Sequence, residues 1–370
     1  MADLELHALS PGGQTVDEMA ARVAAFLSEA QRSLDLALYD VRLPGPAGDL
    51  VAGTLRDAAA RGVAVRIAYN ADHDERIIPP PPSTAPELIE ALPFPTAAIP
   101  GIPDLMHHKY AVRDGEAVWT GSTNWTTDSW TLQENLVTVV RSAELAAAFT
   151  ANFEELWSTR DVSRTGRPEP ARAQLGAHPA RAWFTPGHGE DLSHRIAAAI
   201  GRARTRVRIA SPVITAGPVI GTLAEVAAEG RVDLRGVVDR TQMTEVFRQW
   251  RENPRSAWKV PIVGSFLRAA DFRGKPSTRY TPESPHDFMH AKVTVADDVV
   301  FLGSFNLSRS GEMNAENVLE LHDPELAERL AGFIDQIRER YEAMPIPDDV
   351  PGGATPPASS VAPPPGRRSR

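Results

Sequence analysis

The 370-residue sequence contains no cysteine, few aromatic residues (6%) and no long uncharged apolar run. Without cysteine, the chain cannot form disulfides, use a thiolate nucleophile or bind zinc or an iron–sulfur cluster through sulfur. The longest uncharged apolar stretch, residues 91–103, is broken by prolines and is too short to cross a bilayer. Any catalysis must therefore use histidine and oxygen chemistry.

Basic residues are outnumbered, with 39 Lys and Arg against 48 Asp and Glu, which gives a formal charge of -9. This balance argues against a protein that coats nucleic acid through its overall electrostatic field, but it does not exclude a local basic groove. The first residues lack the positive and apolar segments of a signal peptide. We therefore expect a soluble, cytoplasmic protein.

The chain contains one polar motif twice, and the copies are 182 or 183 residues apart. The members of the first copy are His107, Lys109, Asp114, Ser122, Asn124 and Glu134. The members of the second copy are His290, Lys292, Asp297, Ser304, Asn306 and Glu316. Repeats of this length indicate two similar structural units in one chain.

The sequence around each motif alternates between strand-like and helix-like patterns. A capping box of Thr15 and Glu18 opens a helical stretch, and strand-like runs follow at 34–39 and 63–69, with counterparts at 207–214 and 232–238. This predicts an α/β fold of two pseudo-twofold-related repeats, each a mixed sheet flanked by helices. The predicted parts are an N-terminal repeat (1–160), a linker (161–182), a C-terminal repeat (183–344) and a disordered proline-rich tail (345–370).

The first motif lies on a predicted hairpin with a two-residue turn at Asp114 and Gly115. That turn would place His107 opposite Ser122, with Lys109 on the same face and His108 on the other. The second motif is one residue shorter, so the same pairing of His290 with Ser304 would need an odd-length turn around 296–298.

Taken singly, these residues have ordinary explanations. A lone His-x-Lys is usually a solvated pair, the two aspartates suit turns, and the two glutamates suit the surface. The whole set, however, occurs twice at matching spacing. An imidazole, an ammonium, a hydroxyl and a carboxamide that converge on one point suit a phosphate group.

The duplicated His-x-Lys-x4-Asp pattern with trailing Gly-Ser-x-Asn resembles the signature of the phospholipase D superfamily, over residues from about 5 to 343. The resemblance implies one active site between the halves and a phosphodiester reaction through a covalent phosphohistidine, without metal or cofactor. Because both halves are in one chain, no obligate oligomer is needed. The family convention makes His107 the nucleophile and His290 the general acid.

The resemblance also implies roles for the other motif residues. Lys109, Lys292, Asn124 and Asn306 would hold the non-bridging oxygens, assisted by Ser122 and Ser304. Glu134 and Glu316 would bind the second nitrogen of each imidazole and orient it. Asp114 and Asp297 would organise the site from a turn. The mechanism requires a neutral nucleophile and a protonated acid, so we expect the two histidine pKa values to be pushed apart.

The substrate is less clearly indicated. Segment 240–280 has nine basic and three acidic residues interleaved with aromatics, which suits anionic head groups at a membrane surface, a nucleic acid, or a solvated helix. Apolar loops at 77–105 and 260–267 favour acyl chains. We therefore favour hydrolysis or transphosphatidylation of a phospholipid, with a nuclease or nucleic-acid end-processing enzyme as the alternative. Intact motifs in both halves disfavour a binding protein that has lost catalysis.

Overall fold

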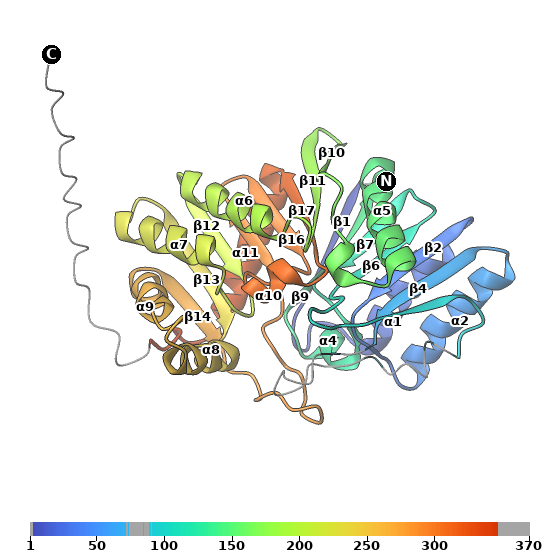
Figure 1. Cartoon of the computed structure of the whole chain (residues 1–370), viewed down its shortest axis with the longest axis horizontal. Helices are drawn as coiled ribbons and strands as arrows, with labels where there is room; N and C mark the ends of the chain where they lie inside the picture. Colours follow the sequence, from blue (N-terminus) through green and yellow to red (C-terminus); the bar gives the residue numbers. More distant parts are fainter. Residues whose placement is uncertain (1–2, 72, 74–83, 85–88, 90, 347–370) are drawn as a thin grey trace, which may run out of the picture.

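The computed structural model describes residues 3–71, 73, 84, 89 and 91–346. Two α/β halves lie side by side, each with a sheet flanked by helices (Figure 1). The predicted fold class is confirmed. The predicted disordered tail lies outside the described residues from position 347 onward, as does much of the apolar loop at 77–105.

The N-terminal half is built on a seven-stranded sheet in the order β1-β9-β7-β6-β2-β4-β5. Helix α1 begins at the predicted capping box, because the Thr15 side chain accepts from the Glu18 N–H and the Glu18 side chain accepts from the Thr15 N–H. The elements are β1 (Leu4–Leu9), α1 (Val16–Ser28), β2 (Ser33–Leu38), β3 (Val41–Arg42), α2 (Pro46–Ala60), β4 (Ala64–Asn70), β5 (Thr96–Ile99), β6 (Lys109–Arg113), β7 (Ala117–Gly121), β8 (Trp125–Thr126), α4 (Thr127–Thr131), β9 (Asn135–Arg141) and α5 (Ala143–Thr159).

The C-terminal half repeats this topology in an eight-stranded sheet, β10-β11-β17-β16-β15-β12-β13-β14. From β11 to β14 the order matches the first sheet strand for strand, including the parallel pairs next to β2 and β12, which supports the predicted duplication. The elements are η1 (Val162–Arg164), β10 (Ala171–Leu175), β11 (His178–Phe184), α6 (Gly189–Arg202), β12 (Arg206–Ala210), α7 (Gly217–Glu229), β13 (Asp233–Asp239), α8 (Arg240–Glu252), α9 (Lys259–Ala269), β14 (Asp271–Lys275), β15 (Val293–Ala296), β16 (Val299–Gly303), α10 (Arg309–Met313), β17 (Asn317–His322) and α11 (Pro324–Arg338).

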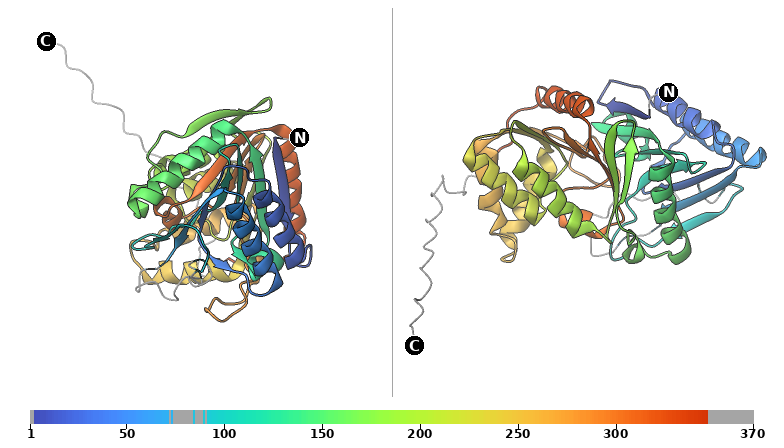
Figure 2. Two further views of the ribbon diagram at one scale, coloured as in Figure 1. Left: turned by 90° about the vertical axis from the view of Figure 1, so that its right-hand side faces the viewer. Right: turned by 90° about the horizontal axis from the view of Figure 1, so that it is seen from above.

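Ten of the 22 residues of the segment predicted as a linker, 161–182, belong to strands of the C-terminal sheet. It contains η1, all of β10 and the first residues of β11. The β10–β11 hairpin packs against α5 of the other half, between the helices of the two halves (Figure 2). Its prolines and polar side chains suggested a plain connection, but Ala173 and Leu175 alternate with exposed residues and are buried in the core.

The two hairpins carry the opposite turns from those predicted. In the first hairpin Arg113 pairs with Ala117, so the loop has three residues, whereas Ala296 pairs with Val299 across a two-residue turn. Asp114 (φ 57°) and Gly115 (φ 66°) still form the predicted turn, closed by a hydrogen bond from the Glu116 N–H to the Arg113 carbonyl at 3.0 Å, but Glu116 is left out of the strand pairing, so the loop gains one residue. The predicted pairing of His107 with Ser122 is therefore wrong.

One apolar core joins the halves. A single cluster of buried side chains includes Phe149 and Phe153 from α5, Leu330 and Ile334 from α11, and Met289 next to the second motif. Because this cluster is continuous across the interface, the two motifs are held in a fixed relation to each other.

Candidate active site

The two motifs meet at a cavity of 280 Å³ between the halves. Loop segments beyond the strand ends supply most of its walls, and both histidines face it. The N-terminal half contributes Tyr39, Asp40, His107, Asn124, Thr126 and Gln133. The C-terminal half contributes Pro212, Gln242, Tyr280, His286, Phe288, His290 and Asn306.

His107 is oriented by a carboxylate from the other half. Its Nδ1 lies 2.8 and 2.9 Å from the two carboxylate oxygens of Glu316, which is fully buried. The His107 backbone N–H donates to the Ala315 carbonyl at 2.9 Å, and the Tyr39 ring lies 4.4 Å away, centroid to centroid. Because a carboxylate only accepts hydrogen bonds, neutral His107 carries its proton on Nδ1 and leaves the Nε2 lone pair free. The expected contact of Glu316 with an imidazole is thus present.

His290 is oriented by an amide instead. Its Nδ1 lies 3.1 Å from Oδ1 of Asn135, and its backbone N–H donates to the Glu134 carbonyl at 3.1 Å. The amide group of Asn135 donates to the Ser129 carbonyl at 3.0 Å, which fixes its oxygen towards His290. The two imidazoles therefore differ in charge environment although their halves share one topology.

The prediction that Glu134 orients an imidazole is wrong. Its carboxylate forms a buried ion pair with Lys275 of β14 at 2.7 Å and accepts a hydrogen bond from the Tyr341 hydroxyl. The backbone pairing explains the difference, since His107 N–H bonds to the residue before Glu316, whereas His290 N–H bonds to Glu134 itself. This one-residue offset places Asn135, not Glu134, beside the ring.

The serines also differ from expectation. Ser122 does not line the cavity; its hydroxyl donates to Asn135 Oδ1 at 2.7 Å and accepts from the Leu136 N–H at 2.9 Å. Ser304 is likewise fully buried and accepts from the Asn317 N–H at 3.0 Å. Both serines therefore support the groups behind the imidazoles and do not reach the cavity.

The two motif lysines are buried and donate to the carbonyl of the histidine two residues before them. Lys109 Nζ lies 2.6 Å from the His107 carbonyl and 4.7 Å from the centre of the Tyr39 ring, and Lys292 Nζ lies 2.8 Å from the His290 carbonyl. Burial lowers the pKa of Lys109 to about 7, although nearby carboxylates oppose this, and burial lowers the pKa of Lys292 as well. Neither lysine side chain lines the cavity.

Both histidine pKa values are shifted in the same direction. Burial first, and then the charges of Lys109 and Lys292, lower the pKa of His107 and His290 well below 6.5. Burial raises the pKa of Glu316 to about 7, although Lys109 opposes that shift. The expectation of two histidine pKa values pushed apart is not met in the protein alone, where both imidazoles are neutral at pH 7.

Asn124 and Asn306 lie where the sequence predicts them, on the cavity wall. Within the described part of the chain, the side-chain oxygen of each is buried without a hydrogen-bond partner. Such buried groups are uncommon in proteins and point to a role in binding. A phosphate oxygen only accepts hydrogen bonds, so the side-chain NH₂ group of each residue, and not this oxygen, is the group that can bind a phosphate in the cavity.

Asp114 and Asp297 lie in the hairpin turns, where the sequence predicts them, and neither lines the cavity. The Asp114 carboxylate accepts the backbone N–H groups of residues 31–33 at 2.6 to 3.2 Å. The Asp297 carboxylate accepts those of residues 204–206 at 2.8 to 3.0 Å. Burial opposes ionisation of Asp297, but these hydrogen bonds outweigh it and lower its pKa to about 2.

The sequence patterns miss a second polar cluster on the cavity wall. Asp40 forms a two-bonded ion pair with Arg42 at 2.9 and 3.0 Å, and Arg42 donates to Nδ1 of His286 at 3.3 Å. The backbone N–H and carbonyl of His286 also bond to Asp128 and Gln133 of the N-terminal half. The one usable signal was the place of Asp40, directly after β2, because the carboxyl ends of parallel strands often carry functional groups.

The basic segment 240–280 does not form an open cationic strip. It folds into α8, α9 and β14, and Arg248, Arg273 and Lys275 each pair with an acidic side chain. The apolar run 260–267 lies in α9 and packs into the core, as do most of the aromatic rings. The structure thus favours the ordinary interpretation of this segment as a solvated helix with a buried face.

One cavity is lined by two neutral imidazoles from equivalent positions of a duplicated α/β fold, with buried lysines and two carboxamides around it. This arrangement is typical of proteins that bind and react with phosphate esters. The family model described as "Cardiolipin synthase, PLD-like domain" matches residues 23–157 and 196–338. The chain therefore belongs to the phospholipase D superfamily of phosphodiesterases.

Individual known proteins resemble parts or all of the chain. A mitochondrial cardiolipin hydrolase of Xenopus tropicalis is 28% identical over 149 residues, which cover 39% of this chain and 64% of that protein. A phosphatidylserine synthase of Haemophilus influenzae covers 91% of this chain and 86% of its own, with a TM-score of 0.62 and 13% identity. A polyphosphate kinase of Porphyromonas gingivalis covers 90% and 47%, with a TM-score of 0.59 and 14% identity. The two structural matches show the fold alone.

None of the helices in the described ranges combines the length and apolar character needed to cross a membrane. Nor does any group of three or more His, Asp and Glu side chains in these ranges form a metal site.

Proposed function

We propose that this protein is a phosphodiesterase that cleaves a phospholipid through a phosphohistidine intermediate, with His107 as the nucleophile. The observation that carries the proposal is the pair of imidazoles on one cavity, of which only His107 is backed by a carboxylate. A carboxylate stabilises positive charge on the ring to which it is bonded, and positive charge develops on the attacking imidazole.

In the first step, Nε2 of His107 forms a bond to phosphorus while the bond from phosphorus to the leaving alcohol oxygen breaks. Protonated His290 gives its Nε2 proton to that oxygen, so the alcohol leaves neutral. Binding of an anionic diester beside His290 raises the pKa of this ring and supplies the protonated form, which the protein alone disfavours.

In the second step, neutral His290 takes a proton from water as the water oxygen attacks phosphorus and the bond to His107 breaks. An alcohol in place of water gives the transphosphatidylated product instead. Asn124 and Asn306, which line the cavity, donate from their side-chain NH₂ groups to the non-bridging oxygens, and the charges of Lys109 and Lys292 act on the same oxygens from behind the cavity wall.

Phospholipid is the favoured substrate class. The matched family model carries the description "Cardiolipin synthase, PLD-like domain", and the matched Xenopus relative is a cardiolipin hydrolase. Arg248 and Arg273 pair with acidic side chains of the basic segment and Lys275 pairs with Glu134, which weakens the feature that spoke most for nucleic acid. A nuclease activity is therefore an outcome of the test and not a second proposal.

The test compares cleavage of cardiolipin and phosphatidylglycerol vesicles, single-stranded DNA and bis(p-nitrophenyl) phosphate, all in EDTA. We expect phosphatidic acid release from lipid and cleavage of the small diester, both lost in His107→Ala. His290→Ala, supplied with a diester that has a good leaving group and quenched with denaturant at alkaline pH, which preserves the acid-labile P–N bond, should accumulate the esterified phosphoryl group on His107. Cleavage of DNA without lipid would overturn the substrate class, and normal activity in His107→Ala would overturn the mechanism.

A further inference from the structure

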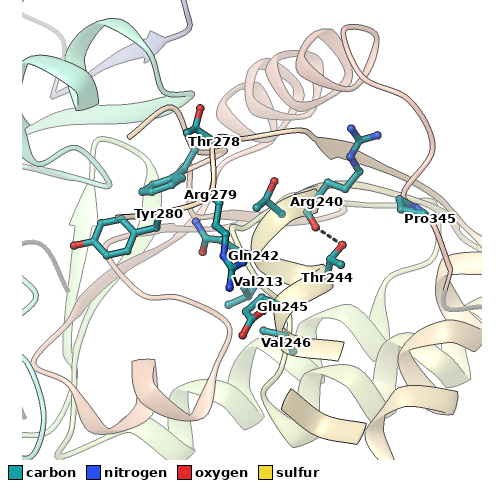
Figure 3. Close-up of a pocket in the computed structure, with 12 residues that line it drawn as sticks. Val213, Arg240, Gln242, Thr244, Glu245, Val246, Thr278, Arg279, Tyr280 and Pro345 are labelled. Atoms are coloured by element: carbon teal, nitrogen blue, oxygen red, sulfur yellow. Dashed lines mark hydrogen bonds between the residues drawn. The ribbon is translucent and has the colours of Figure 1, made fainter. Parts of the chain in front are cut away.

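Tyr280 is a wall residue of the catalytic cavity that belongs to neither motif. It follows β14 in the segment that leads to the second motif, so the C-terminal half supplies it. The same side chain is part of the wall of a second cavity, of 640 Å³, at the start of α8 (Figure 3). In this view the ring and hydroxyl of Tyr280 point away from Glu245 and Val246, which line the second cavity alone. The hydroxyl is therefore not directed at the second cavity.

The hydroxyl of Tyr280 is buried and has no hydrogen-bond partner within the described residues. The charges of Asp40 and Arg42, from the other half, act on it, and Asp40 lines the catalytic cavity. These two residues are bonded to each other at 2.9 and 3.0 Å, and neither is bonded to the hydroxyl. A buried hydroxyl without a partner is uncommon in a native protein and indicates a group that a ligand completes.

The chemistry of this hydroxyl suits an anionic oxygen. Burial raises the pKa of Tyr280 to about 12, although the charge of Arg42 opposes this shift. At neutral pH the group therefore has an O–H to donate, and a phosphate oxygen only accepts. The Asp40 carboxylate would repel an anion, but its two bonds to Arg42 leave the pair without net charge.

Ring contacts hold Tyr280 in place. Its ring lies 4.9 Å from that of His286 and 6.2 Å from that of Phe288, centroid to centroid, and both rings are part of the same cavity wall. His286 is tied to the N-terminal half, because its Nδ1 accepts from Arg42 at 3.3 Å and its backbone carbonyl accepts from Gln133 at 2.7 Å. A donor that is fixed before the substrate binds needs little reorganisation when charge develops on its acceptor.

We infer that Tyr280 is a further catalytic residue, whose hydroxyl donates a hydrogen bond to a non-bridging oxygen of the phosphate group between the two imidazoles. The catalytic cavity, at 280 Å³, is small for a ligand pocket, so the reacting phosphate lies close to the groups of its wall. With the side-chain NH₂ groups of Asn124 and Asn306, the hydroxyl gives these oxygens a third neutral donor. The inference rests on the proposed function, because it requires a phosphate group at His107 and His290.

The test compares Tyr280→Phe, which removes only the hydroxyl, with Tyr110→Phe as the matched control. Tyr110 is fully buried, its hydroxyl donates to Oδ1 of Asn152 at 3.0 Å, and it does not line the catalytic cavity. Each full-length variant is assayed on bis(p-nitrophenyl) phosphate and on phosphatidylglycerol vesicles. Its melting temperature is measured with and without inorganic phosphate.

We expect Tyr280→Phe to lower kcat/KM on both substrates by about 10- to 100-fold, the loss typical of one hydrogen bond to a charged group. Its melting temperature should equal or exceed that of wild type, because the hydroxyl that is removed is buried and unpartnered. Inorganic phosphate should raise this melting temperature less than that of wild type. Tyr110→Phe should show the opposite, a lower melting temperature with wild-type kcat/KM for the folded protein.

Wild-type kcat/KM in Tyr280→Phe, or a loss of activity that accompanies a fall in its melting temperature, would overturn the inference. Failure of wild type on every substrate would refute the proposed function instead. In that case equal stabilisation of wild type and Tyr280→Phe by inorganic phosphate would overturn the role of the hydroxyl separately.

Discussion

The pair of buried glutamates offers a sharp test of the site, because equivalent positions in the two halves have different partners. Glu316 bonds to His107, whereas Glu134 bonds to Lys275 and Tyr341. Glu316→Gln keeps the shape of the side chain and an oxygen that can accept from Nδ1, but it removes the negative charge. Glu134→Gln is the same substitution at the position that does not contact an imidazole.

The magnitude follows from the geometry. At a pH above the Glu316 pKa of about 7, the carboxylate is charged, and two unit charges about 4 Å apart interact by about 4 kcal/mol at an effective dielectric constant of ~20. That interaction is lost from the transition state, in which His107 becomes positively charged, so kcat should fall by about 10³-fold. Glu134→Gln leaves Lys275 buried without its partner, so it should reduce the free energy of unfolding by several kcal/mol, of the order of 3–5, with a much smaller effect on the turnover of folded protein.

The assay is steady-state hydrolysis of bis(p-nitrophenyl) phosphate, with active protein quantified by unfolding in denaturant. Single-turnover phosphorylation of His107 separates the first step from the second. The rate of the first step should fall much less in folded Glu134→Gln than in Glu316→Gln. An equal fall would refute the assignment of His107 as the nucleophile on the basis of its carboxylate partner.

Three further outcomes follow from the same contacts. The acid limb of kcat/KM against pH should have its midpoint below 6.5, because the pKa of His107 is lowered and the ring attacks only when neutral. Lys292→Met removes one of the charges that lower this pKa, so a pH titration of its rate should show the midpoint at higher pH. Since the pKa of Lys109 is about 7 in the folded protein and has its usual value of 10.5 in the unfolded chain, ionisation of this group makes stability fall as pH decreases from 10.5 to 7. Inactive Lys109→Met should therefore gain in melting temperature relative to wild type at pH 7 but not at pH 10.5, and an equal gain at both would contradict the low pKa. Asp297→Asn should lower the free energy of unfolding by about 1–3 kcal/mol, because it weakens the hydrogen bonds to the backbone of residues 204–206. Denaturant titration measures this loss, and the turnover of folded protein should stay within about twofold of wild type.

Much of the architecture could be predicted because it depends on local patterns. The capping box at Thr15, the alternation of strands and helices, and the spacing of the two motifs are all readable along the chain. The convergence of His107 and His290 followed from the duplication, since equivalent points of two repeats related by a twofold axis can meet only near that axis.

The errors concern choices that depend on tertiary contacts. The turn at Asp114 and Gly115 has a clear local sequence signal, but the strand pairing beyond it has none, and Glu116 is left out of that pairing, so the register shifts by one residue. The partner of Glu134 depends on Lys275 and Tyr341, which lie 141 and 207 residues away in the chain. No pattern within the motif can indicate which of two adjacent side chains, Glu134 or Asn135, faces an imidazole.

The two buried serines separate the sequence-based account of the site from the structural one. If Ser122 touched the phosphate, as the motif implies, Ser122→Ala would remove a donor to the transition state and lower kcat by about 10²- to 10³-fold. In the structure its hydroxyl instead bonds to Asn135, which in turn orients His290. We therefore expect a fall in kcat of only about 3- to 10-fold with KM unchanged, the cost of a loosened positioning group.

The readout that distinguishes these accounts is the leaving-group dependence. Ser122 acts through the general acid, so Ser122→Ala should impair substrates with poor leaving groups more than those with p-nitrophenolate, which needs little protonation. A direct contact with the non-bridging oxygens would slow both kinds of substrate alike. An equal and large loss on both, in a variant with the wild-type melting temperature, would place Ser122 at the phosphate and refute the arrangement in which Asn135 separates it from the cavity.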